Sequence, residues 1–226
     1  MNVLDQIKKA IKKWSIDAVP FDPAKFDDEL ANRVSWGPAK SGGASFKTHR
    51  LVIDEPFLAQ FKTTIGHLVF GAIFLLVGLG LVVIYFNPTL GGLIPKESGS
   101  GASWVPIVVG VVFTIVGGGI LYSALSPISF DKREGVFRKG RKAADVMAHA
   151  ETDLTSGVVQ LSEVHAIQLI AERCRSKDSS YMSYELNLVL ATGKRVNVVD
   201  HGGHHQIRED AKRLGDFLDV PVWDAT

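Results

Sequence analysis

The chain has 226 residues, and its 25 lysines and arginines nearly balance its 24 aspartates and glutamates, which leaves a formal net charge of +1. A single cysteine, Cys174, cannot form an internal bridge, so a disulfide scaffold is excluded. The charges are unevenly distributed, because residues 63–130 contain only Lys96 and Glu97. This distribution excludes a disordered chain and a plain soluble enzyme, and it predicts a membrane protein with soluble flanks.

The first segment combines helical periodicity with basic charge. Its apolar residues recur at helical spacing from Val3 to Trp14. The pattern predicts a basic amphipathic helix over residues 1–14, which lies either in the lipid headgroup layer or against a protein surface. Its expected lipid contacts are Lys8, Lys9, Lys12, Lys13 and Trp14.

Residues 15–62 lack a sustained period, so we expect a cytoplasmic linker. A short helix is expected at residues 27–33. Residues 45–53 and 57–62 contain enough aromatic and β-branched side chains for short strands. Such strands must pair with each other or with the domain that follows to be stable.

Two uncharged apolar runs, residues 65–86 and 105–125, are each long enough to cross the hydrocarbon layer of a bilayer as a helix. The turn-rich residues 87–104 between them predict an extracytoplasmic loop of a transmembrane hairpin. A pair of buried core helices is the alternative, which the length of the runs disfavours. Small residues at helical spacing are expected to pack helices together, within this chain or with another protein: Gly71, Gly78, Gly110, Thr114 and Gly118.

Basic residues near the two runs predict the orientation of the hairpin. Lys47, Arg50 and Lys62 precede the first run, whereas Lys96 alone lies between the runs. Six basic residues follow the second run, and they are also expected to contact lipid: Lys132, Arg133, Arg138, Lys139, Arg141 and Lys142. Because basic residues collect on the cytoplasmic side, both termini are expected to be cytoplasmic.

The last hundred residues have the patterns of strands and of one amphipathic helix. Hairpins are expected around residues 128–138 and 184–198, and a further strand at residues 164–171. Residues 141–156 predict a short helix. An apolar stripe from Ile207 to Leu218 predicts a closing helix, after which residues 220–223 form an extended tail against the sheet.

The strand segments of this region read, in order, FDKREGVF, LSEVHAIQLI and YELNLVLATGKRVNVV, and a helix follows them. This order resembles bacterial PH-like domains that are tethered to membrane hairpins. The resemblance covers residues 127–226 and implies a cytoplasmic α+β domain, in which an antiparallel PH-like sheet is closed by a C-terminal helix. It also implies a multi-pass protein of the bacterial cytoplasmic (inner) membrane that acts in scaffolding or membrane-proximal binding.

One cluster has side chains of the kind that bind metals: Asp200, His201, His204 and His205. Its spacing matches no specific metal motif, and neighbouring residues on a helix point about 100° apart. The interpretation we favour is a glycine turn that leads into the last helix, with Asp200 or a histidine near its exposed amides. We therefore expect no metal and no cofactor.

Several classes of activity lack support in the sequence. It has no phosphate-binding GxxxxGK[ST] loop and no GxSxG elbow, and no base suitably placed beside Cys174. Residues 131–226 carry 14 basic and 15 acidic side chains, which argues against nucleic-acid binding. The prediction is a non-enzymatic accessory or scaffold protein that recognises a membrane-protein partner or a second copy of itself. A lipid or small-ligand sensor and a metal-dependent membrane hydrolase using the histidine cluster are the alternatives.

Overall fold

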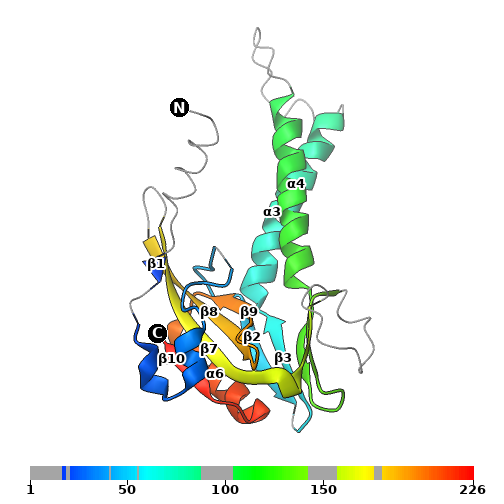
Figure 1. Ribbon diagram of the computed structural model, residues 1–226. Helices are drawn as coiled ribbons and strands as arrows, with labels where there is room; N and C mark the ends of the chain where they lie inside the picture. The colour runs from blue at the N-terminus through cyan, green and yellow to red at the C-terminus, as the bar shows by residue number, and fades with distance from the viewer. Residues whose placement is uncertain are drawn as a thin grey trace. The chain divides into compact units, whose positions relative to one another are not determined.

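The computed structural model describes residues 17–18, 21–40, 42–54, 56–87, 104–141, 157–175 and 180–226. The chain forms two compact units, drawn in Figure 1. One contains Met1–Lys62 together with Pro127–Thr226, and the other contains Thr63–Ser126. The helix predicted at residues 1–14, including its expected lipid contacts, lies outside the described residues, as do Lys142 and nearly all of the helix predicted at residues 141–156.

The second unit is built from two long apolar helices. Helix α3 is Ile65–Phe86 and α4 is Val105–Ala124, so the predicted helix positions are confirmed, with α4 ending one residue earlier. Both are long and apolar enough to cross a membrane, judged by length and composition. Large apolar side chains are exposed along both, among them Ile65, Ile73, Leu76, Phe86, Ile115 and Tyr122.

Sheet B combines strands that precede the two helices in the sequence with strands that follow them. Its strands, in the order in which they pair, are β2 (His49–Asp54), β3 (Leu58–Thr63), β4 (Ile128–Asp131), β5 (Val136–Lys139) and β6 (Val158–Gln160). Strands β3 and β4 are antiparallel, with Leu58 opposite Asp131 and Gln60 opposite Ser129. The expected β4–β5 hairpin is present, and its turn contains Gly135 at a φ of 70°.

The short strands predicted at residues 45–53 and 57–62 are present as β2 and β3, and they pair in one sheet with β4 of the region that follows the helices. The sheet-rich unit therefore does not begin at residue 127, because its core includes Leu51 and Phe61 from before the helices. The physical reason is that a short two-stranded hairpin is unstable alone and gains a third strand from β4.

Sheet A holds the remaining strands. They are β1 (Asp17–Ala18), β7 (Val164–Arg175), β8 (Ser180–Leu190), β9 (Arg195–His201) and β10 (Val222–Ala225). Strands β7, β8 and β9 form an antiparallel meander, in which β8 and β9 are the hairpin predicted from alternation and β7 contains the strand predicted at residues 164–171. The tail strand β10 pairs with β7 in parallel, with Val222 opposite Ile167, which differs from a purely antiparallel sheet.

Both sheets and helix α6 (His204–Leu218) share one apolar core. The predicted stripe of α6 contributes Ile207, Ala211 and Leu214, which are buried because residues spaced by three or four share one face of a helix. A second cluster places Trp223 of β10 against Ala31 and Val34. Ala31 lies in the short helix α2 (Glu29–Arg33), and Val34 directly follows it. This helix comes after the 3-10 turn η1 (Pro23–Phe26) and matches the helix predicted at residues 27–33.

Candidate functional site

Glycines bring the backbones of α3 and α4 into direct contact. A Cβ atom on Gly78 would lie 2.4 Å from the backbone nitrogen of Thr114, and one on Gly117 would lie 2.3 Å from that of Leu75. Gly71 and Gly110 are similarly enclosed by side chains and backbone of the facing helix. Side chains at Gly78 and Gly117 would force the helices apart, because real Cβ atoms do not approach backbone atoms so closely.

The contact differs in one position from the predicted packing set. Gly71, Gly78, Gly110 and Thr114 lie in the contact, but a Cβ on Gly118 would meet nothing within 4 Å. At about 100° per residue, the seven-residue step from Gly110 to Gly117 returns to within about 20° of the same face. Two four-residue steps to Gly118 instead rotate about 80° away. A seven-residue spacing from Gly110 was therefore the sequence signal that could have identified Gly117 as a contact residue.

The basic residues that follow α4 do not form one surface. Lys132 lies over the ring of Phe217, with Nζ 4.6 Å from the centroid, and Arg133 lies over the ring of Phe57. Arg138 forms an ion pair with Glu134. These groups are dispersed because two of them lie in the β4–β5 turn and the others alternate between the faces of β5. The shared lipid-contact role predicted for this run therefore stays a prediction.

Lys139 is half-buried. Its Nζ donates to the backbone oxygen of Asn197 at 2.8 Å and to Asn197 Oδ1 at 2.6 Å. Burial, followed by the charge of Lys40, lowers the pKa of Lys139 to about 8. This lysine therefore joins β5 to β9, and its amine is engaged within the protein.

One face of sheet A carries buried polar side chains, and residues 35–40 and 42–48 cover it. We refer to these residues as the covering segment. The carboxylate of Glu185 is 1% exposed and accepts the backbone N–H groups of Ala39 at 2.9 Å and Lys40 at 3.3 Å. Ser183 Oγ accepts the N–H of Ala44 at 2.9 Å. Hydrogen bonds to a buried carboxylate are strong, so they hold the covering segment on the sheet.

The same face continues with amide and guanidinium groups. Gln168 Nε2 donates to the backbone oxygen of Ser35 at 3.1 Å, and Arg195 donates to that of Gly37 at 2.7 Å. Asn187 is fully buried, and among the described residues neither of its side-chain polar atoms has a hydrogen-bond partner. Glu185, Ser183, Gln168 and Arg195 of this face thus bind the part of the chain that precedes α3.

Glu185 and Asn187 alternate with apolar residues along β8, a pattern typical of a strand with one exposed face, but both are buried. The pattern did identify the two faces of the strand, but it contains no sign of the covering segment. The side chains that bind this segment were therefore not predicted as functional residues.

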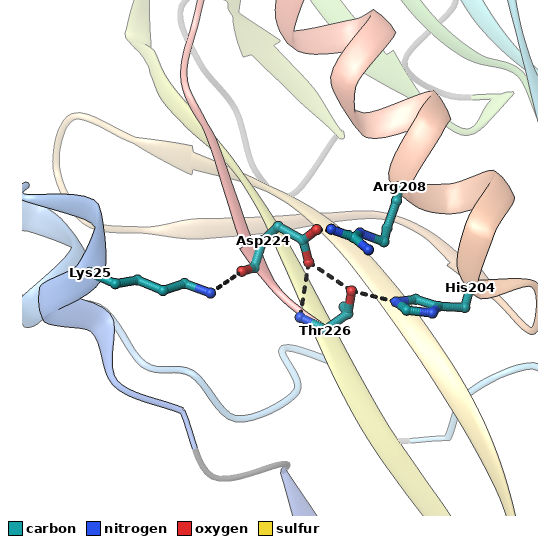
Figure 2. A network of polar contacts seen from close by, with 5 residues as sticks. All are labelled: Lys25, His204, Arg208, Asp224 and Thr226. Atoms are coloured by element: carbon teal, nitrogen blue, oxygen red, sulfur yellow. Dashed lines mark hydrogen bonds and ion pairs between the residues drawn. The ribbon is translucent and has the colours of Figure 1, made fainter.

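A second polar network, shown in Figure 2, joins the tail strand to η1 and α6. Lys25 Nζ donates to the backbone oxygen of Asp224 at 2.6 Å, and Arg208 Nε donates to its Oδ2 at 2.5 Å. Thr226 donates to Asp224 Oδ1 and lies 2.8 Å from His204 Nε2. Burial raises the pKa of Asp224, but hydrogen bonds from Thr226 and Arg208 outweigh it and lower that pKa overall. This network fixes β10 beside β7.

The structure gives the four candidate metal ligands of the sequence separate surroundings. His201 is fully buried, and its Nδ1 accepts the N–H of Gly203 at 2.8 Å. His204 is engaged with Thr226 and stacks on Tyr184, while His205 is exposed. The Asp200 carboxylate accepts from Asn197 Nδ2 at 3.1 Å. Within the described part of the chain, no group of three or more His, Cys, Asp or Glu side chains could hold a metal ion.

We expect His201 to make the folded protein sensitive to acid. Burial, followed by the charge of Lys47, lowers the pKa of His201 below its ordinary value of 6.5. The unfolded chain therefore binds the proton first, so folding stability is lost as the pH falls below about 6.5. His201→Asn keeps an acceptor near the N–H of Gly203 but removes the titration. Thermal unfolding in detergent at about pH 7.5 and about pH 5.5 should show a smaller acid-induced drop in melting temperature for this variant.

The exposed His205 supplies the control for that measurement. His205→Asn should retain the drop of the wild type, because it removes an exposed histidine and leaves the buried His201 in place. Equal drops for the wild type and His201→Asn would contradict the assignment.

Comparisons with family models, with curated proteins and with solved structures found no match to this chain. The chain is thus described by its own architecture, which is two long apolar helices together with a sheet-rich α/β region.

Proposed function

We propose that the chain is a membrane-anchored scaffold, in which α3 and α4 cross a bilayer and hold the sheet-rich unit at one membrane face. The observation that carries this proposal is the antiparallel pairing of β3 with β4. These strands lie on opposite sides of the helices in the sequence, and one sheet cannot be shared across a bilayer. Two crossings return the chain to the starting side, so a hairpin is the arrangement that permits this pairing.

The dimensions of the helices support the crossing. At about 1.5 Å per residue, the 22 residues of α3 and the 20 of α4 extend about 33 Å and 30 Å, close to the ~30 Å hydrocarbon layer. At one end of the hairpin, the hydroxyl of Thr63 donates to the backbone oxygen of Ala124. The exposed apolar side chains along both helices are what a lipid environment requires.

The orientation follows from the basic flanks. Arg50, Lys62 and Arg141 belong to the parts of the chain outside the helices, whereas Lys96 is the one basic residue between them. The positive-inside rule therefore favours a cytoplasmic sheet-rich unit in the inner membrane of a bacterium.

A PH-like architecture is the finer proposal for the sheet-rich unit. Its support is the succession of antiparallel strands in two sheets, followed by a helix that shares their core. Strands β1 and β10 are additions to such an arrangement. Because most of the buried polar groups described above bind the protein's own backbone, we assign the unit to protein recognition without catalysis.

Fractionation and purification of the full chain test this proposal. The protein should stay in the membrane pellet after alkaline carbonate treatment, because two apolar spans resist extraction. In mild detergent it should purify with a stoichiometric partner protein or as a homo-oligomer of the 24.6 kDa chain. Release by carbonate would contradict the anchor. Recovery of monomers alone in several detergents would contradict the scaffold role.

A further inference from the structure

The covering segment lies on sheet A without joining it as a strand. None of its described residues belongs to a strand or a helix. Near one end, Trp36 Nε1 donates to the backbone oxygen of Ala31 at 2.8 Å. At the other end, Thr48 is buried, and its hydroxyl donates to the backbone oxygen of Asp200. Between these fixed ends lies a strap of which no described residue is buried, comprising residues 37–40 and 42–45.

Side chains of sheet A bind the backbone of this strap. Glu185 and Ser183 accept its N–H groups, as described above. Arg195 donates to one of its carbonyl oxygens at 2.7 Å, and the hydroxyl of Tyr181 donates to that of Gly43 at 3.2 Å. These contacts use N–H and C=O groups that nearly every residue possesses. The face beneath the strap therefore recognises a polypeptide backbone with little dependence on its side chains.

At one position, the face accepts only glycine. A Cβ atom on Gly43 would lie 2.0 Å from Ser183 Oγ and 2.2 Å from Ser183 Cβ. Ser183 is 1% exposed, and its Cβ cannot rotate aside because it is bonded directly to the backbone of β8. Glycine thus lets the strap approach the sheet closely. A chain that replaced the strap would need a glycine here for the same reason.

Two side chains on this face are buried without a full set of hydrogen bonds. Glu172 lies opposite Ser183 in the pairing of β7 with β8, so it shares the face that the strap covers. It is 1% exposed, and its Oε2 has no hydrogen-bond partner among the described residues. Asn187, unpaired as described above, follows Glu185 by two positions on the same face. Water reaching these groups would favour opening of the strap, which its hydrogen bonds oppose.

We propose that the strap is releasable and that the face beneath it binds an extended, glycine-containing segment of a partner protein in its place. The strap is then an internal occupant that must leave before the partner's segment binds. Burial raises the pKa of Asp200, and the charge of Lys40 in the strap opposes this rise. The partner's segment should therefore carry a basic residue in the place of Lys40. This inference rests on the protein-recognition role proposed above and names the chemistry of the partner.

Peptide binding to the full chain tests the strap. The probe is a fluorescein-labelled peptide with the sequence of residues 35–48, and fluorescence anisotropy measures its affinity for the protein in mild detergent. Gly43→Val should free the face, because valine cannot fit against Ser183. This variant should bind the peptide at least about tenfold more tightly than the wild type, whose own strap competes. The same peptide carrying Gly43→Val should bind neither protein.

Two controls accompany this measurement. Ser45→Val introduces the same side chain at an exposed position of the strap and should behave as the wild type. Adding Glu185→Gln to Gly43→Val should remove most of the binding, because it removes the charged acceptor of two backbone N–H groups. Far-UV circular dichroism confirms that the variants are folded. Equal affinity of the wild type and Gly43→Val, or tight binding that survives Glu185→Gln, would overturn the proposal.

Hydrogen exchange of the wild type gives a readout that needs no variant. Amides of the strap should exchange at least about tenfold faster than those of β8, because the strap opens while the sheet stays folded. Equal rates would mean that the strap leaves only when the sheet unfolds, which would also overturn the proposal.

Co-purification separates the strap from the scaffold role. A protein that purifies with a partner, but whose Gly43→Val variant binds no peptide, contradicts the strap alone. Recovery of monomers alone, together with the expected peptide binding, supports the strap and contradicts the scaffold role.

Discussion

Replacing Gly117 by leucine should force α3 and α4 apart. A Cβ atom at this position would lie 2.3 Å from the backbone nitrogen of Leu75 and 2.8 Å from its Cα, and backbone atoms cannot move aside without shifting the helix. We expect the free energy of unfolding to fall by about 3 kcal/mol or more, which is at the upper end of the effects of overpacking. The measurement is the temperature at which the protein in detergent loses its monodisperse peak in size-exclusion chromatography.

The neighbouring glycine supplies the control. Gly118→Leu adds the same side chain where the structure shows nothing within 4 Å, so its effect should stay below about 0.5 kcal/mol. Equal behaviour of the two variants, or greater damage from Gly118→Leu, would show that the helices pack through another face.

Phe130→Ala should strongly destabilise the sheet-rich unit. The Phe130 ring is fully buried on β4, 4.7 Å from the ring of Phe137 and 6.4 Å from that of Phe61 on β3. Its removal leaves a cavity between strands from before and after the helices, and such losses cost about 3–5 kcal/mol. Urea unfolding followed by tryptophan fluorescence should show the corresponding drop in midpoint.

Phe57→Ala deletes the same side chain from the turn between β2 and β3. Phe57 is 41% exposed, and Arg133 lies over its ring, so its loss should cost less than about 1 kcal/mol. A cost for Phe130→Ala as small as this would mean that β3 and β4 do not share a core.

Local patterns predicted the elements well. Uncharged length identified α3 and α4, an apolar run identified most of β7, and alternation identified β8 and β9, because each signal is contained within the element itself. The pairing of β3 with β4 could not be derived in this way. Its partners are separated by the whole hairpin, and no local period records which distant strand completes a sheet.

The polar groups were less predictable for a related reason. Glu185 alternates with apolar neighbours and so has the pattern of an exposed residue, yet the amides of Ala39 and Lys40 cover it. Whether the second face of a strand is buried depends on a segment elsewhere in the chain, so the sequence of the strand itself does not reveal it. Lys139 likewise belongs to a basic run in the sequence but is bound by Asn197 on another sheet.

Single-cysteine labelling in intact cells tests the central claim that α3 and α4 form a hairpin whose two flanks lie in one compartment. Cys174 is buried and has a pKa raised by burial, so it is replaced by alanine and reporters are placed at Ser98 and at the exposed Lys212. A membrane-impermeant maleimide should label Ser98→Cys in intact cells, but Lys212→Cys only after permeabilisation. A cytoplasmic control protein confirms that intact cells exclude the reagent; if Lys212→Cys is labelled in such cells, the proposed cytoplasmic orientation is contradicted. If both reporters are protected until permeabilisation, the hairpin itself is contradicted.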